Sequence, residues 1–348
     1  MIPKVERPEE GAVFYNPVQE LSRDFSVAVY SAMGVRSVCD PLAATGARGV
    51  RIAREIGIPV TCGDISKVAC GLIKKNAREN RVASKVSVAS RNANSLMAEG
   101  FGWDAVDIDP FGSPVPFVDL AARAAGSVLA ITATDPAALC GVYPRVTWRK
   151  YLARVVKTDF YHEVGIRILA GYAVRMAAKY EVALTPRICH SSNHYYRIYF
   201  GKEKGSKRSD SALENIGSLF WCPSCGFRSS TGKAQCICDS GSSRIKEIGP
   251  LYIGGLFDGS LCKAALAEAD KRGFGACKAL LERISKEASL PAFHYEHHAL
   301  CSFKHTAPGK LEVLLGALRG AGFSAERTHF SENGFRTDAP LRKILEIV

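Results

Sequence analysis

The chain has 348 residues, and at about 150 residues per domain this length favours two domains that each bury a hydrophobic core. Apolar residues make up 47% and charged residues 23%, an ordinary globular composition that excludes a small disulfide scaffold and a disordered chain. The formal net charge of +12 indicates a polyanionic partner, and nucleic acid is the first candidate.

The first 16 residues are rich in charges and have no apolar run behind them, so we expect no secretory signal. No stretch of 18 uncharged apolar residues follows, which predicts a chain without a membrane span. The twelve cysteines are then not expected to form a disulfide framework. We expect a cytoplasmic protein, and no sequence feature indicates an obligate protein partner.

From residue 36 onward, short β-branched runs alternate with helical stretches. The predicted strands are 37–40, 60–64, 86–89, 105–109 and 128–134, and helices are predicted between them, for example at 49–56 and 67–80. This alternation implies right-handed βαβ units and a largely parallel, doubly wound α/β sheet. A long amphipathic helix at 161–180 and two more strands, 181–189 and 195–201, complete seven strands that end in a hairpin.

The polar segment 202–211, KEKGSKRSDS, predicts a flexible domain boundary. We therefore expect a first domain at 1–205 and a second, smaller α+β domain at 212–348. The second domain is predicted to contain a strand at 251–257 and helices at 260–272, 275–287 and 310–321.

Positive charge is concentrated between residues 141 and 180. Eight lysines and arginines in this segment oppose only Asp159 and Glu163, giving a local charge of +6. Such a segment can follow a phosphate backbone, or it can be the solvated face of a helix. Charge alone leaves both interpretations open.

The run 38–50, VCDPLAATGARGV, is typical of a strand end, a small-residue turn and the start of a helix. Small residues let a ligand approach the backbone, and a helix N-terminus attracts a carboxylate or phosphate. Asp64 ends the next strand, where an acid can accept hydrogen bonds from ribose hydroxyls. The alternative is that Asp64 caps the helix that starts near Ser66.

The motif Asp109-Pro110-Phe111-Gly112-Ser113-Pro114 ends the fourth strand, at the edge where open α/β sheets bind ligands. Asp109 and a neighbouring carbonyl can accept both protons of an exocyclic amine, while Phe111 stacks on a flat base. The motif therefore favours methylation of an amine by a sulfonium donor. A simple turn explains its Pro and Gly but not an acid beside an aromatic ring.

Four cysteines are grouped in the second half of the chain. Cys222 and Cys225 form a Cys-Pro-x-Cys-Gly knuckle, and Cys236 and Cys238 follow as a Cys-x-Cys pair in place of the commoner Cys-x-x-Cys. This spacing predicts a structural zinc ion with four sulfur ligands, against the alternative of unliganded thiols. Because all four positions are sulfur, no open site for catalysis is expected.

Several other charged residues and histidines are expected to support the fold and to have no catalytic or metal-binding function. Glu163 and Arg167, four residues apart on a helix, are expected to form a routine surface ion pair. His162 is expected to be a partner within the fold. His294, His297 and His298 follow no metalloprotease order, and we expect packing or capping roles for them.

Several motifs along nearly the whole chain resemble the tRNA (guanine-26 N2)-dimethyltransferase family. They are FYNP at 14–17, LSRD at 21–24, ATGARG at 44–49, DPFGSP at 109–114, RTHF at 327–330 and RTDA at 336–339. The resemblance implies an S-adenosylmethionine-dependent methyltransferase domain that methylates the exocyclic N2 of guanosine 26 in tRNA, forming N2,N2-dimethylguanosine. We expect the second, zinc-bearing domain to help to dock tRNA.

The resemblance also implies site residues. The catalytic set is Asp109 and Pro110 with Phe111 and Phe14 on either side of the target base. The residues implied to contact S-adenosylmethionine are Arg23, Arg48, Asp64, Asn92 and Ala93.

The sequence departs from the family where Asn92-Ala93-Asn94 replaces the usual Asp-Ala-Asn, although an Asn carbonyl can still accept from the adenine amine. Two alternatives remain: a zinc-ribbon RNA-binding protein with a silent methyltransferase domain, and an amino-methyltransferase acting on another nucleic acid.

Overall fold

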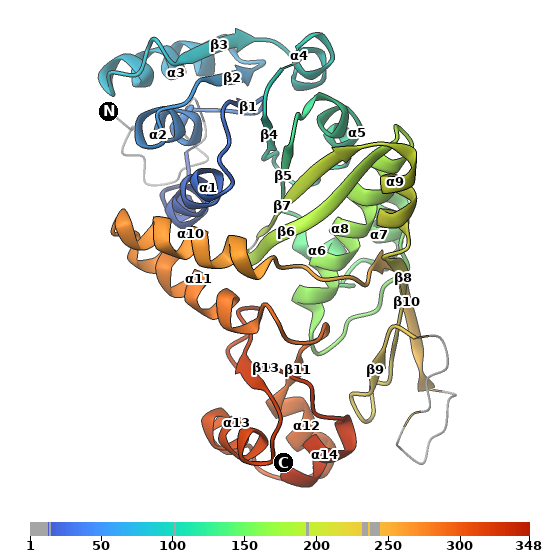
Figure 1. Ribbon diagram of the computed structural model, residues 1–348. Coiled ribbons are helices and arrows are strands. Elements are labelled where there is room, and N and C mark those ends of the chain that lie inside the picture. The colour runs from blue at the N-terminus through green and yellow to red at the C-terminus, as the bar shows by residue number, and fades with distance from the viewer. Residues whose placement is uncertain (1–12, 14, 101, 193–194, 232–235, 237–243) are drawn as a thin grey trace.

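The computed structural model describes residue 13 and residues 15–100, 102–192, 195–231, 236 and 244–348 (Figure 1). A seven-stranded sheet in the order β3-β2-β1-β4-β5-β7-β6 is built from strands between Val38 and Lys204. Its strands are β1 Val38–Asp40, β2 Val60–Asp64, β3 Val86–Ser90, β4 Ala105–Ile108, β5 Val128–Ala133, β6 Val182–Ser192 and β7 Tyr195–Lys204. Strands β1 to β5 are parallel, and β7 runs antiparallel to both β5 and β6. The predicted doubly wound sheet with a closing hairpin is confirmed.

Alternate residues of β5 show how the two faces of the sheet are covered. Leu129 and Ile131 belong to a core shared with helices α4, α5 and α8, whereas Val128 and Ala130 belong to a core shared with α1, α2 and α3. The helices of this half are α1 Glu20–Ala32, α2 Ala47–Glu55, α3 Lys67–Glu79, α4 Ala93–Glu99, α5 Val115–Ala124, α6 Pro136–Leu139, α7 Pro144–Tyr151 and α8 Tyr161–Ala178.

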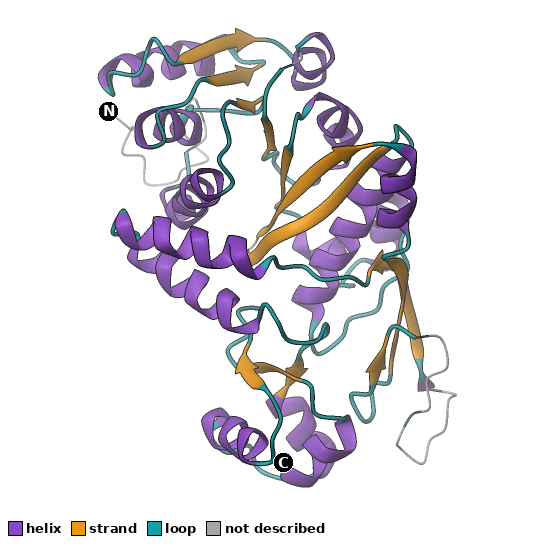
Figure 2. Cartoon of the chain, in the orientation of Figure 1, coloured by secondary structure: helices purple, strands orange, loops and turns teal. Residues whose placement is uncertain are grey.

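The second half of the chain is a smaller α+β assembly around two three-stranded sheets (Figure 2). One sheet has the order β10-β8-β9 and the other β11-β13-β12. Their strands are β8 Ile216–Trp221, β9 Arg228–Ser229, β10 Lys246–Tyr252, β11 Tyr295–Glu296, β12 Ala325–Arg327 and β13 Gly334–Thr337. The helices are α9 Ser206–Leu213, α10 Gly259–Lys271, α11 Gly275–Glu287, α12 His297–Lys304, α13 Leu311–Gly320 and α14 Leu341–Ile347.

The two halves share hydrophobic cores. Helices α10 and α11 pack in the same core as α1, and β10 lies against α8. Gly171 permits the second contact, because a Cβ atom there would lie 2.9 Å from the backbone nitrogen of Tyr252. Among the described residues, no helix is long and apolar enough to cross a membrane.

Two sequence expectations are wrong. Segment 202–211 is not a flexible boundary, because β7 extends to Lys204 and α9 begins at Ser206 and packs on β6 and α8. The segment is polar in composition, but helix α9 buries a narrow face that includes Ser209 and Ala212. The strand expected at 251–257 lies earlier, at Lys246–Tyr252, because its antiparallel partner is β8.

Candidate active site at the carboxyl edge of the sheet

The loop between β1 and α2 is fastened to the end of β2. The backbone N–H of Ala43 donates to the carbonyl of Gly63 at 2.8 Å, and the N–H of Ala44 donates to Oδ2 of Asp64 at 3.0 Å. Gly46 adopts a φ of 72° at the N-cap of α2, and a Cβ atom there would come within 2.9 Å of the Ile73 side chain. Glycine is therefore required both by conformation and by space.

Asp64 is not the cap of the following helix. The N-cap of α3 is Ser66, whose hydroxyl accepts from the N–H of Ala69, so the capping alternative for Asp64 is wrong. Oδ1 of Asp64 instead accepts from the N–H of Ser66 at 2.8 Å. A carboxylate offers about four acceptor positions, and two backbone donors use only part of them. The half-buried Asp64 thus retains capacity to accept from a ligand.

Two buried acids at the ends of β1 and β4 were not singled out by the sequence reasoning. Burial, together with the nearby Asp107 carboxylate, raises the pKa of Asp40 to about 7. Burial also opposes ionisation of Asp107, but Arg197 and Arg48 hold its pKa below the ordinary value. Oδ2 of Asp107 accepts from Arg197 at 2.6 Å and from the Tyr30 hydroxyl at 2.7 Å. The sequence feature that could have identified them is an aspartate within an otherwise apolar strand, because acids are rarely buried without a partner.

Arg48 links α2 to the loop that follows β4. Its guanidinium donates to Oδ2 of Asp109 and, at 2.6 Å, to the Ser26 hydroxyl. It also lies 3.8 Å from Oδ2 of Asp107. The structure therefore places Arg48, which the resemblance implied as a cofactor contact, directly against Asp109. Its role toward the cofactor stays a prediction.

Hydrogen bonds fasten the loop that holds Pro110 and Phe111 to neighbouring elements. Gly112 and Thr134 exchange two hydrogen bonds, at 2.6 and 2.9 Å, and the Ser113 hydroxyl lies 2.8 Å from that of Tyr151. Phe111 projects from this loop with 71% of its surface exposed. Phe14, expected on the other side of the target base, lies outside the described residues.

The other expected cofactor contacts have local roles in the fold. The buried Arg23 donates to the carbonyl of Asn16 at 3.1 Å and thereby holds the segment before α1. Asn92 is the N-cap of α4 and accepts from the N–H of Asn94 at 2.9 Å, and Ala93 is the buried first residue of that helix. Their contact with a cofactor stays a prediction.

Three of the four expected metal ligands come together. The sulfur atoms of Cys222, Cys225 and Cys236 all lie within 4.8 Å of one another, with 3.2 Å between Cys225 and Cys236. The N–H of Gly226 donates to the carbonyl of Cys222, which closes the knuckle. Cys238 lies outside the described residues.

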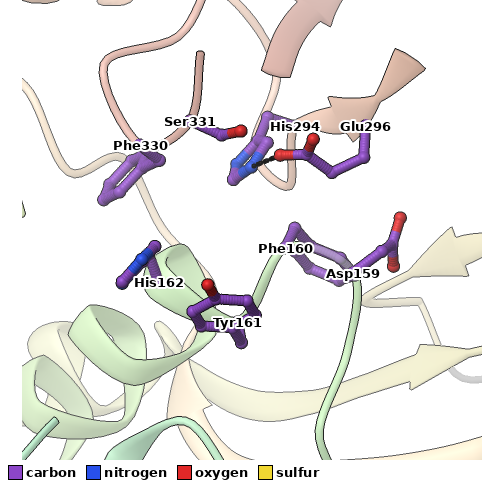
Figure 3. A pocket seen from close by; sticks show the side chains of 8 residues that line it. All are labelled: Asp159, Phe160, Tyr161, His162, His294, Glu296, Phe330 and Ser331. Carbon is purple, nitrogen blue, oxygen red and sulfur yellow. Dashed lines mark ion pairs between the residues drawn. The ribbon is translucent and has the colours of Figure 1, made fainter. Parts of the chain in front are cut away.

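A cavity of about 220 Å³ separates the start of α8 from the C-terminal strands (Figure 3). His162 lines it, and its Nδ1 lies 3.0 Å from the hydroxyl of Tyr196, which pairs with the last residue of β5. The cavity therefore adjoins the carboxyl edge of the sheet. Its lining is Asp159, Phe160, Tyr161, His162, His294, Glu296, Phe330 and Ser331.

A buried ion network meets this cavity at His294, which lines the cavity and lies 2.8 Å from Glu163. Glu163 accepts from Arg167 at 2.9 Å and from the N–H groups of Phe293 and His294 at 2.9 Å each, and it pairs with Arg336 at 3.0 Å. Arg336 in turn binds Glu287. The expectation of a surface pair between Glu163 and Arg167 is wrong, because both side chains are buried. Spacing along one helix does not reveal partners that lie far away in the sequence.

The fold and the acidic carboxyl edge define the class of α/β methyltransferases. A family model described as "TRM: N2,N2-dimethylguanosine tRNA methyltransferase" matches residues 3–348. The chain belongs to this family.

Individual relatives agree with this assignment. The tRNA (guanine(26)-N(2))-dimethyltransferase of Thermococcus kodakarensis is 39% identical over 100% of this chain and 96% of its own. That of Methanosarcina acetivorans is 37% identical over 98% and 92%. Among solved structures, Trm1 from Pyrococcus horikoshii, in complex with S-adenosyl-L-methionine, matches with a TM-score of 0.90 at 33% identity and covers 100% and 96% of the two chains.

Proposed function

We propose that this chain catalyses S-adenosylmethionine-dependent methylation of the exocyclic N2 of guanosine 26 in tRNA, forming N2,N2-dimethylguanosine. The observation that supports it most directly is the Asp109 loop. This loop places the acid Asp109 beside the exposed ring of Phe111, at the edge of the sheet where α/β folds bind ligands, and hydrogen bonds hold it in place.

The residues at this edge fit the cofactor. S-adenosylmethionine has a positively charged sulfonium and ammonium and a ribose with two hydroxyls. Asp107, whose pKa is lowered, and Asp109 supply negative charge, and Oδ1 of Asp107 is buried without a hydrogen-bond partner in the described part of the chain. Asp64 at the end of β2 supplies acceptor capacity for the ribose. When bound, the cofactor supplies an electrophilic methyl group on sulfur.

The protein's task is to present a poor nucleophile in line with that methyl group. The N2 lone pair of guanine is delocalised into the ring, so the amine must be held and its N–H bonds polarised. Asp109 accepts an amine hydrogen bond, and Arg48 keeps the carboxylate oriented. In the first transfer the carbonyl of Pro110 accepts a hydrogen bond from the second N–H of the amine, and the rings of Phe111 and Phe14 enclose the base. In each transfer the N2–methyl bond forms, the sulfur–methyl bond breaks, and the amine gives up one proton toward Asp109.

We also propose that Cys222, Cys225, Cys236 and Cys238 bind a structural zinc ion. Three converging sulfur atoms, two of them buried, suit a metal with tetrahedral thiolate coordination. Residues 212–348 would then act as a zinc-containing domain that docks tRNA beside the catalytic domain at 1–205. With tRNA as the substrate, we place the reaction in the cytoplasm.

The test is nucleoside mass spectrometry after incubation with isotopically labelled S-adenosylmethionine. We expect labelled N2-methylguanosine and then N2,N2-dimethylguanosine from a tRNA transcript with guanosine at position 26. The matched control is the same transcript with inosine at position 26, which lacks only the exocyclic amine. Equal labelling of both transcripts, or labelling of neither, contradicts the proposal.

A further inference from the structure

Helix α7 and the residues that flank it combine exposed rings with positive charge. Of the large apolar side chains that are well exposed in the described part of the chain, four fall within 142–152: Val142, Tyr143, Trp148 and Leu152. Trp148 is 52% exposed and Tyr143 58%. Arg145, Trp148 and Arg149 are three and four residues apart, so they share one face of the helix. Exposed apolar side chains gathered in one short segment make this surface a candidate interaction site.

The basic segment predicted from the sequence divides into two groups in the structure. Its C-terminal members are engaged within the fold, since Arg167 pairs with Glu163, Arg175 donates to the carbonyl of Tyr151, and Lys179 pairs with Asp119. Lys150 likewise pairs with Asp135 at 3.2 Å. The exposed charges on and after α7 are Arg145, Arg149, Arg154 and Lys157. No acidic residue occurs between positions 141 and 157.

The inner face of α7 is fastened to the candidate catalytic loop. The Tyr151 hydroxyl donates to Asp135 at 2.8 Å and lies at the same distance from the hydroxyl of Ser113, two residues after Phe111. At the far end of the patch, Arg154 exchanges backbone hydrogen bonds with Gly249, and its guanidinium lies 5.7 Å from the Trp148 ring centre. These bonds hold the patch in place relative to the candidate catalytic loop.

We propose that Arg145, Trp148 and Arg149 on the outer face of α7, together with Tyr143 at its N-cap and Arg154 beyond its C-cap, form a stacking platform for an unpaired tRNA nucleotide near the methylated guanosine. Aromatic rings beside guanidinium groups suit unstacked bases on a phosphate backbone, because the rings stack on the bases while the arginines neutralise phosphates. The strong positive charge favours RNA over another protein surface. This inference rests on the proposed function, since it assigns part of the tRNA contact.

Tryptophan fluorescence of the full-length protein tests the platform directly. Trp221 is buried, and Trp103 is half-buried with its indole N–H donated to Thr61, so Trp148 is the exposed tryptophan of the three. We expect tRNA to quench the emission of Trp148 and to protect it from acrylamide. The change should disappear in Trp148→Phe, which keeps a ring and retains most of the tRNA affinity. A tRNA-dependent change that persists in Trp148→Phe overturns the proposal.

Affinity measurements then separate stacking from charge. We expect Trp148→Ala to weaken tRNA binding about 5- to 150-fold, the range for one stacked base, without changing the salt slope. Arg149→Gln should instead make the slope shallower by about 0.7 to 0.9. The matched control is Tyr180→Ala, which removes an exposed ring beside Arg123 and Lys179, next to the start of β6 at the opposite edge of the sheet. Equal losses in Trp148→Ala and Tyr180→Ala overturn the proposal.

The remaining outcomes also distinguish this inference from the proposed function. If the unmodified protein dimethylates guanosine 26 and Trp148→Ala does so with unchanged KM for tRNA, the platform is refuted and the function stands. If Trp148 is protected by raising the protein concentration in the absence of RNA, and sedimentation shows self-association, the face is a contact between copies and the inference fails.

Discussion

Replacement of Asp109 by asparagine tests the proposed chemistry most directly. Arg48 donates to one oxygen of this carboxylate, which leaves the other oxygen to accept from the substrate amine. In Asp109→Asn one of these positions becomes an NH₂ donor. If the amide group turns its oxygen toward Arg48, the NH₂ opposes the guanine amine, and in the reverse orientation it opposes the guanidinium.

Either orientation removes one hydrogen bond to a charged group, worth about 1.5–3 kcal/mol. At about 1.4 kcal/mol per factor of ten, the methyl-transfer rate should fall on the order of 100-fold. Because the interaction strengthens as the N–H bonds polarise, the affinities for tRNA and S-adenosylmethionine should stay nearly unchanged.

The assay is single-turnover methylation with both substrates saturating, accompanied by calorimetry of cofactor binding. Asp119→Asn is the matched control, because it makes the same change at a surface residue paired with Lys179. Arg48→Lys, which keeps the charge but loses the planar fork, should give a smaller rate loss than Asp109→Asn. An Asp109→Asn rate within about threefold of the original value would place the chemistry elsewhere.

Three further predictions address the cofactor, the metal and pH. Asp64→Ala should weaken S-adenosylmethionine binding by about 1–3 kcal/mol in calorimetry, and an unchanged affinity would remove Asp64 from the site. Cys225→Ser should lose bound zinc in elemental analysis together with thermal stability, whereas absence of metal from the unmodified, reductively purified protein would refute the zinc proposal. Although burial opposes its charge, hydrogen bonds to Glu163 and Glu296 raise the pKa of His294. Protonated His294 should therefore stabilise the fold fully below about pH 6.5, and this contribution should decline as pH rises through the raised pKa. In chemical denaturation, His294→Gln should lower the free energy of unfolding most at low pH, and a loss that does not depend on pH would contradict this.

The sheet was predictable because its strands are short apolar runs separated by turn residues. Strand β2 was placed at its observed bounds, and β1, β3, β4 and β5 to within one residue at either end. The same reasoning failed at 202–211, where polar composition indicated a linker. Helix α9 buries only a narrow face there, and a few small side chains give little hydrophobic periodicity.

The candidate site was predictable in its parts but not in its contacts. The positions of Asp64 and Asp109 follow from strand ends, since the carboxyl ends of parallel strands share one edge. That Arg48 would bond to Asp109, 61 residues away, does not follow from any local pattern. Sequence reasoning also missed Asp40 and Asp107. Strands were recognised as apolar runs, and a single acid inside such a run departs from the pattern without indicating a function.

The buried network around Glu163 bears on how the second half of the chain meets its substrate. A buried ion cluster often contributes little net stability, because desolvation of the charges offsets their attraction. It does select one arrangement, since Glu163 on α8 is bonded to Arg336 on β13 and to the backbone before β11, and any other packing leaves those charges unpaired. If residues 212–348 dock tRNA, the distance from the docking surface to Asp109 determines which guanosine reaches the carboxylate. On that proposal, the network would help to fix this distance and with it the choice of target nucleotide.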